Sequence, residues 1–113
     1  MDVRENPAPK LEGELRRGAL VLAVLSQLRE MQYGYSLRQA LALRGMAIEE
    51  GTLYPLLRRL EAQGVLASEW RIEEGPPHRY YRLNDAGEAL LAELTGTWNA
   101  LVRTMAGLIG SEA

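Results

Sequence analysis

Hydrophobic residues follow a helical period over the first third of the chain. Leucines recur at near-helical spacing between residues 12 and 31, which predicts a helix there. Residues 19–25 are apolar on every side, so we expect this helix to be buried between neighbours or subunits. The preceding residues 1–11 contain two prolines and little that is apolar, and they are expected to form a flexible N-terminal arm.

Two shorter helical segments follow, joined by a short link. Residues 36–44 predict a helix with Ser36 as its N-cap, and Gly45 suits the left-handed position after a helix end. A further helix is predicted from Gly51 or Thr52 to Gln63, with Pro55 in its first turn, where the missing N–H is tolerated. Together they predict a helix-turn-helix over residues 35–63.

The spacing changes to that of strands after Gly64. Residues 66–73 repeat with a period of two, which indicates a strand, and residues 79–83 give a return strand. Between them, residues 74–78 hold a glycine and two prolines and are predicted to be a loop. A hairpin directly after a helix-turn-helix is the wing of a winged helix.

The last segment, residues 84–113, predicts one long helix capped by Asn84. Its apolar residues step by four and three, which is the spacing of a coiled-coil seam. A single helix cannot cover such a stripe, so the seam is expected to pack against its copy in a homodimer. The predicted fold class is therefore mainly α with a small β-hairpin: a winged helix-turn-helix DNA-binding domain over residues 12–83 and a C-terminal dimerisation helix. The seam residues are Leu94, Trp98, Leu101, Met105 and Leu108.

Length and composition narrow the classes of function. A chain of 113 residues makes one domain with a thin core, which favours self-association. With no cysteine and the single histidine His78, thiolate and histidine-cluster metal sites are excluded, and we expect no metal and no cofactor. The start has no signal-peptide pattern and no apolar run is long enough to span a bilayer, so we expect a cytoplasmic protein without a membrane partner.

The net charge of −2 conceals an uneven distribution. Residues 16–82 carry ten arginines against seven glutamates, a net +3, whereas residues 1–15 carry −2 and residues 83–113 carry −3. The basic excess therefore lies in the helix-turn-helix and the wing, where an anionic partner such as double-stranded DNA would bind.

The helix over residues 52–63 has the composition of a DNA-reading helix. Its leucines fall on one face, and small residues and arginines lie opposite them. Arg58 and Arg59 are placed to reach guanine edges or phosphates in the major groove. The alternative is an ordinary solvated face on which Arg58 pairs with a nearby glutamate.

The predicted wing tip carries its own donors. Two prolines stiffen the loop, and His78, Arg79 and Arg82 can lie against phosphates or in the minor groove. The alternative is a solvated turn.

The sequence gives little support for catalysis. The adjacent glutamate pairs do not face a common substrate, and no serine has the histidine and acid partners that a nucleophile needs, so no catalytic residue is expected.

Trp98 has two interpretations. It fills the dimer core, or two Trp98 rings near the two-fold axis form a flat cleft that binds a planar hydrophobic molecule.

The motifs together resemble those of PadR-type transcriptional regulators. Residues 51–64 (GTLYPLLRRLEAQG) look like the recognition-helix signature of that family, and the YGY run at 33–35 and the GPPHRYYRL run at 75–83 match it too. The single helix after the wing resembles the small subfamily. His78 stands where a basic residue is common in the family and Asn84 where threonine is common, which keeps the cap.

The resemblance implies a bacterial dimer, usually a repressor, that binds a pseudo-palindromic operator and is released by a small molecule. Some small PadR-like regulators bind planar aromatic compounds between subunits with a tryptophan on the last helix, which corresponds to Trp98. The alternative function is a dimeric ligand-binding or protein-interaction module on the same fold without DNA binding. By analogy with the family, the DNA contacts are Tyr35, Ser36, Thr52, Tyr54, Arg58 and Arg79.

Overall fold

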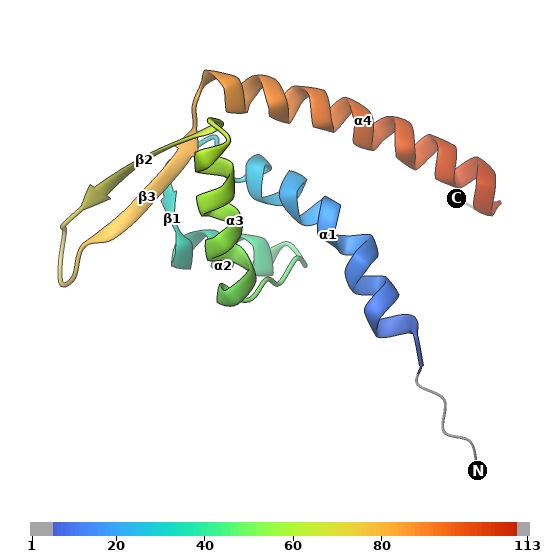
Figure 1. Cartoon of the computed structure of the whole chain (residues 1–113), viewed down its shortest axis with the longest axis horizontal. Coiled ribbons are helices and arrows are strands. Elements are labelled where there is room, and N and C mark those ends of the chain that lie inside the picture. The colour runs from blue at the N-terminus through green and yellow to red at the C-terminus, as the bar shows by residue number, and fades with distance from the viewer. Residues whose placement is uncertain (1–5, 111–113) are drawn as a thin grey trace, which may run out of the picture.

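The computed structural model describes residues 6–110. The helix-turn-helix and a small sheet form the body of the molecule, from which the wing projects on one side and two long helices on the other (Figure 1). The predicted fold class, mainly α with a small β part, is confirmed. The elements are α1 (Ala8–Ser26), β1 (Gln32–Tyr33), α2 (Gly34–Leu43), α3 (Glu50–Ala62), β2 (Leu66–Arg71), β3 (His78–Leu83) and α4 (Asp85–Ile109).

The sheet has three antiparallel strands in the order β1-β3-β2. The predicted hairpin is present and pairs Leu66 with Leu83 at its base and Arg71 with His78 near its tip. The strand β2 ends at Arg71, before the predicted residue 73, and β3 begins at His78, inside the predicted loop. The short strand β1 was not predicted, since two residues cannot show a period. It forms because β3 offers a free edge, on which Tyr33 lies opposite Tyr80.

The core is built mainly from leucines, which come from the three N-terminal helices, the turn after α1, the base of the wing and, through Leu91, α4. On α3 the predicted apolar face is confirmed, because all four of its leucines are buried: Leu53, Leu56, Leu57 and Leu60. By the hydrophobic effect, each such side chain contributes about 1.5–3 kcal/mol. The opposite face of α3 is thereby fixed toward solvent.

The start of α4 is locked to the end of α3. The side chain of Asn84 caps α4 as predicted, accepting from the backbone N–H of Gly87 at 2.9 Å. The same side chain donates through Nδ2 to the carbonyl of Gly64 at 2.9 Å. Gly87 lies so close to the carbonyl of Val65 that no Cβ would fit there.

The boundaries of α1 differ from the predicted ones. This helix begins at Ala8, inside the predicted arm, because prolines are accepted in a first turn and Asn6 Oδ1 accepts from the Ala8 N–H at 3.0 Å. Residues 1–5 of the arm lie outside the described residues. The helix ends at Ser26, before residue 31, because the carbonyl of Leu28 turns to accept from Leu83 N in the sheet at 2.8 Å.

Two details of the helix-turn-helix also differ. The N-cap of α2 is Tyr33, and the predicted cap Ser36 instead donates its hydroxyl to the Tyr33 carbonyl at 3.0 Å. Because α3 begins at Glu50, Pro55 lies in its second turn and removes the helical donor for the exposed carbonyl of Gly51. Gly45 has φ +90°, which confirms its left-handed position.

Candidate nucleic-acid interface and apolar hollow

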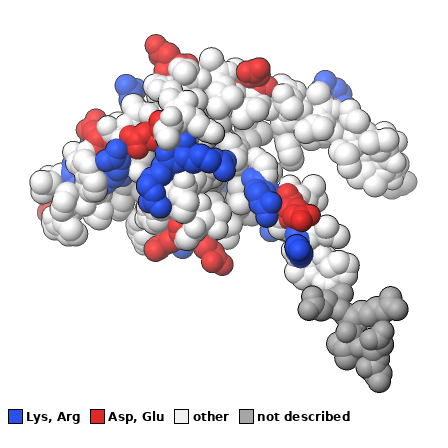
Figure 2. All heavy atoms as spheres, in the orientation of Figure 1, with Lys and Arg blue, Asp and Glu red and all other residues white. Residues whose placement is uncertain are grey.

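The solvent-facing side of α3 carries the predicted mixture of small residues and arginines. The exposed residues of α3 are Glu50, Gly51, Thr52, Pro55, Arg58, Arg59 and Ala62. Figure 2 shows basic side chains gathered over α3 on the face of the molecule that this view presents. Among the described residues, neither Arg58 nor Arg59 takes part in an ion pair. The alternative in which a nearby glutamate pairs with Arg58 is therefore not what the described part of the chain shows.

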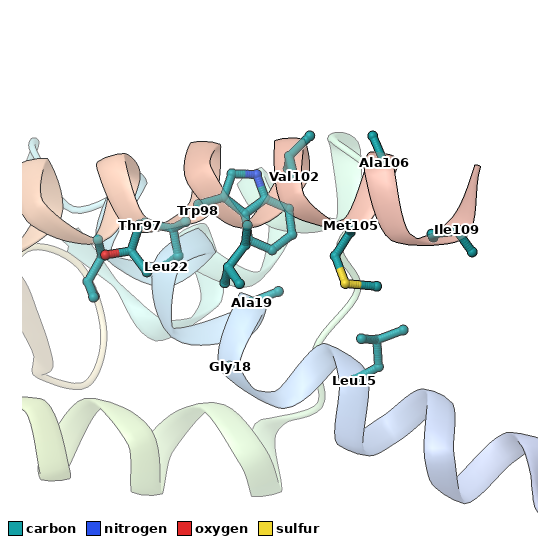
Figure 3. A pocket seen from close by; sticks show the side chains of 12 residues that line it. Leu15, Gly18, Ala19, Leu22, Thr97, Trp98, Val102, Met105, Ala106 and Ile109 are labelled. Carbon is teal, nitrogen blue, oxygen red and sulfur yellow. The ribbon is translucent and has the colours of Figure 1, made fainter. Parts of the chain in front are cut away.

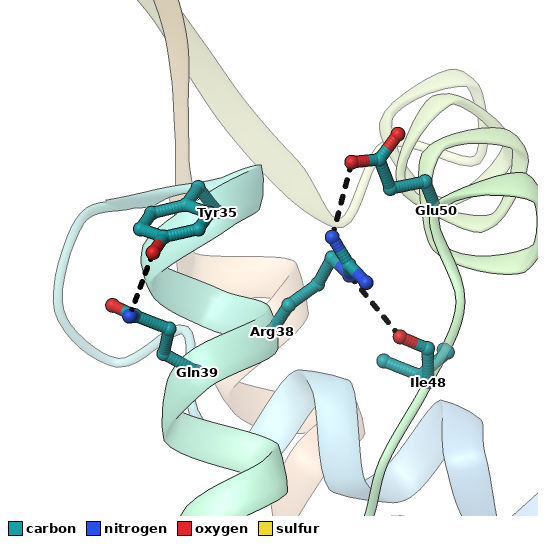
Figure 4. Close-up of polar contacts among 5 residues, drawn as sticks. All are labelled: Tyr35, Arg38, Gln39, Ile48 and Glu50. Carbon is teal, nitrogen blue, oxygen red and sulfur yellow. Dashed lines mark hydrogen bonds and ion pairs between the residues drawn. The ribbon is translucent and has the colours of Figure 1, made fainter.

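An arginine that sequence reasoning missed joins α2 to the start of α3. Arg38 on α2 donates from Nη1 to Glu50 Oε1 at 3.0 Å and from Nε to the carbonyl of Ile48 at 3.2 Å (Figure 4). Glu50 is the first residue of α3, and Ile48 belongs to the preceding link. Arg38 thus holds the start of α3 in place, and no period or motif in the sequence indicated it.

The residues expected to bind DNA near the start of α2 differ in accessibility. Tyr35 is 53% exposed, and its hydroxyl accepts from Gln39 Nε2 at 3.0 Å one turn along the helix (Figure 4). Ser36 is half-buried and its hydroxyl donates to the backbone of Tyr33. Tyr54 on α3 is half-buried too, with its ring against Gly34. Of these three residues, Tyr35 is the most accessible.

The wing presents His78 and Arg79 in different ways. His78 is exposed, with its ring centroid 4.8 Å from that of Tyr33. Arg79 is half-buried and donates from Nη2 to Glu61 Oε2 of α3 at 2.9 Å. Arg82, farther along β3, is exposed.

Acids on the wing and on α3 compensate some of the arginines. Glu69 pairs with Arg71 at 2.9 Å, and Glu61 pairs with Arg79. Glu73 accepts from the hydroxyl of Tyr80 at 2.8 Å, and this hydrogen bond is the main reason that the pKa of Tyr80 is raised. The uncompensated positive charge on this side of the molecule therefore comes chiefly from arginines outside these ion pairs, such as Arg58 and Arg59.

A hollow of about 470 Å³ lies between α3 and the wing. It brings together four of the eight predicted DNA-contact residues. The other four do not line it: Tyr35, Ser36, Thr52 and Arg59. Trp70 and Glu61 also line it, and sequence reasoning had not singled them out for this role. The four predicted residues are Tyr54, Arg58, His78 and Arg79.

A second hollow of about 660 Å³ lies between α1 and α4 and is lined almost wholly by apolar side chains. Figure 3 shows Trp98 between the two helices, with Met105 beside it where they diverge. Four of the five predicted seam residues line this hollow; Leu108 does not. The α1 residues of this hollow were not predicted as part of a site. The segment 19–25, which is apolar on every side, was the feature of the sequence that could have indicated them. The α1 residues are Leu15, Gly18, Ala19 and Leu22.

The apolar seam is largely open to solvent in the single chain. Trp98 and Met105 are each 45% exposed, and Leu108 is 75% exposed. Leu15 on α1 is also exposed. An apolar surface of this kind marks an interaction site more often than a free surface.

The described residues contain neither a membrane-spanning helix nor a metal-binding cluster. No helix there is both long and apolar enough to cross a bilayer. Residues 6–110 also contain no cluster of three or more histidine, aspartate or glutamate side chains that could hold a metal ion.

A helix-turn-helix followed directly by a β-hairpin defines the winged helix-turn-helix class. In this chain the second helix of the motif, α3, exposes arginines to solvent. Residues 21–93 match the profile of the transcriptional regulator PadR-like family. The chain belongs to this family.

Relatives with known names and structures agree with this assignment. A transcriptional regulator of Mycobacterium tuberculosis is 39% identical over 95 residues, covering 83% of this chain and 89% of that protein. The crystal structure of a PadR family regulator from Eggerthella lenta has 48% identity and a TM-score of 0.85, covering 93% of this chain and 94% of that one. A PadR-like transcription factor from Bacteroides fragilis has 35% identity and a TM-score of 0.74, covering 88% and 98%. These relatives are named as regulators and not as enzymes.

Proposed function

We propose that the protein is a homodimeric, ligand-responsive repressor that binds a pseudo-palindromic operator in the cytoplasm. The observation that carries the DNA-binding part is the pair Arg58 and Arg59, exposed on α3 and outside the ion pairs of the described residues. Two copies of α3 would enter successive major grooves about 34–36 Å apart.

The contacts divide by position on the protein. Thr52, Arg58 and Arg59 lie on the exposed face of α3 and would meet base edges and phosphates. The remaining proposed residues lie on α2, on the half-buried flank of α3 and on the wing, and would meet the backbone of the DNA. They are Tyr35, Ser36, Tyr54, His78 and Arg79.

Dimerisation is proposed through the exposed seam of α4. The side chains of Leu101 and Met105 are about half exposed in the single chain, and a second copy of α4 would cover them. Since a two-fold interface uses the same patch on both subunits, a self-complementary apolar stripe is sufficient. The thin core of a chain this short gains burial in the same way.

Ligand response is proposed for the hollow between α1 and α4. Its volume of about 660 Å³ and its apolar lining suit a planar hydrophobic molecule stacked on Trp98. Such a molecule would alter DNA affinity only if it bound one arrangement of the two subunits better than the other.

Selection of bound duplexes from a random pool tests the DNA-binding part directly. A repressor of this design should enrich a two-fold symmetric sequence. With that duplex, Arg58→Ala should weaken binding and flatten the salt dependence by about one unit if Arg58 contacts a phosphate. Arg103→Ala is the matched control, because Arg103 is an exposed arginine on α4, away from α3.

The alternative function is a dimeric ligand-binding or protein-interaction module without a DNA face. The exposed acid Glu49, just before α3, and the net charge of −2 are the observations in its favour, since both weaken the attraction to phosphates. Failure to enrich any sequence, together with ligand binding at Trp98, would favour this module.

A further inference from the structure

Two residues of the wing point to the same side of the hairpin, toward α3. In the antiparallel register, Ser68 of β2 lies opposite Tyr81, and Arg79 of β3 lies two residues before Tyr81. Since side chains two residues apart share a face of a strand, Ser68 and Arg79 share one face. Both meet the same acceptor on α3.

That acceptor is Glu61, in the last turn of α3. The hydroxyl of Ser68 donates to its Oε2. Arg79 Nη2 donates to Oε2 at 2.9 Å and to Oε1 at 3.2 Å. The guanidinium of Arg79 also lies 5.5 Å from the ring centroid of Trp70, so it is held by the wing and by the helix.

The carboxylate of Glu61 is ionised at neutral pH. The Ser68 hydrogen bond first, and the Arg79 guanidinium second, lower its pKa against the opposing effect of burial. Both hydrogen bonds from Arg79 to Glu61 use Nη2, which leaves other N–H groups of this planar cation able to donate to a further acceptor.

The place where Arg79 is held is the hollow between α3 and the wing. Arg58 lines the same hollow from α3. An anion there would meet two guanidinium groups, one of them held in position by Glu61. In a protein that places α3 in the major groove, the anion next to that helix is a phosphate of the DNA backbone.

We propose that Glu61 is a positioning residue for DNA binding: together with Ser68 it holds Arg79 so that its remaining N–H groups meet a backbone phosphate. This inference rests on the proposed DNA-binding function. Glu61 does not itself contact the DNA. If it acted only through its negative charge it would repel the phosphate, so the two roles give opposite effects when the charge is removed.

The experiment uses the full chain and the duplex obtained by selection, titrated at several salt concentrations. Arg79→Ala should weaken binding about tenfold and flatten the salt slope by about 0.9, the value for one lost phosphate contact. Glu61→Gln should weaken binding about three- to tenfold with the slope unchanged, because a neutral amide orients the guanidinium less firmly. In the Arg79→Ala background, Glu61→Gln should have no further effect.

Two variants separate positioning from charge. Ser68→Ala leaves the net charge unchanged and should also weaken binding a few-fold, since it removes one of the bonds that hold the carboxylate. Glu69→Gln is the matched control: this wing glutamate pairs with Arg71 and should leave affinity unchanged or slightly raised. Thermal unfolding of each variant shows that it is folded.

Tighter binding by Glu61→Gln, or additive effects of Glu61→Gln and Arg79→Ala, would overturn the proposal. An unchanged slope in Arg79→Ala would overturn it as well, while a flattened slope in Arg58→Ala would leave the DNA-binding function standing. If no variant and no wild-type protein binds any duplex, the proposed function itself fails.

Discussion

The ring of Tyr54 on α3 lies directly against the backbone of Gly34, the first residue of α2. A Cβ placed at position 34 would overlap the ring carbons and the hydroxyl oxygen of Tyr54. The contact sets the separation of the two helices of the helix-turn-helix. Tyr54, predicted from the family resemblance as a DNA contact, therefore also has a packing role.

Gly34→Ala should destabilise the fold. The added methyl group forces the Tyr54 ring to move, and overpacking of this kind costs about 1–3 kcal/mol. Urea unfolding followed by circular dichroism measures the free energy of unfolding. Gly51→Ala is the matched control, since a Cβ at position 51 meets nothing within 4 Å. Inside a helix this change should be neutral or stabilising by up to about 1 kcal/mol. Equal effects of the two substitutions would contradict the packing role.

Leu101→Glu should convert the proposed dimer to monomers. A charge in an apolar seam loses its hydration without gaining a partner, which costs several kcal/mol in a dry interface. Sedimentation velocity over a range of protein concentrations measures the change. Asn99→Glu is the control, because position 99 is exposed on the opposite side of α4. Dimerisation that survives Leu101→Glu would place the interface elsewhere.

A planar aromatic ligand should quench the fluorescence of Trp98. The chain has two tryptophans, and Trp70→Tyr leaves Trp98 as the only tryptophan, whose emission is separated from that of the tyrosines by selective excitation. Trp70 is 62% exposed on the wing, so this substitution should not disturb the core. Titration of the variant with a panel of planar aromatic compounds gives the binding curves. The reciprocal variant Trp98→Phe should show no saturable quenching. If no compound quenches Trp98, this residue is dimer core only.

The contribution of Glu61 to stability should depend on pH. Its folded-state pKa is lowered, so the carboxylate stabilises the fold at pH values above its unfolded pKa. This stabilisation is lost as the pH falls through the lower folded-state pKa. The difference in unfolding free energy between wild type and Glu61→Gln should therefore be full at pH 6–7 and shrink in the acid range below about 4. For a pair this accessible we expect about 1 kcal/mol or less. A difference that grows toward acid pH would contradict the cause assigned to the pKa shift.

Much of the fold could be predicted because its signals are local. The leucine face of α3, the period-two hairpin and the cap at Asn84 each depend on residues close together in the sequence. Where the local structure depends on a contact with a residue far away in the sequence, the local pattern gives the wrong boundary. The end of α1 is the clearest case, since the carbonyl of Leu28 serves Leu83 in the sheet.

The candidate sites could be predicted only in part for the same reason. Exposed arginines on a helix opposite its leucines can be found by counting positions. The brace from Arg38 to Glu50 and the link from Arg79 to Glu61 join residues 12 and 18 positions apart, and no period connects them. The α1 side of the Trp98 hollow likewise depends on how two separate helices lie together.

Asn84 connects α4 directly to the end of α3, the helix proposed to enter the major groove. Its side chain holds the start of α4 and the carbonyl after α3 at once. In the proposed dimer, a change in the tilt of α4 would therefore move α3 with it, because no flexible linker separates the two helices. The distance between the two α3 helices of the dimer would then depend on the angle at which the two α4 helices cross. The side chains of the seam, which touch no base, would therefore select the half-site spacing of the operator.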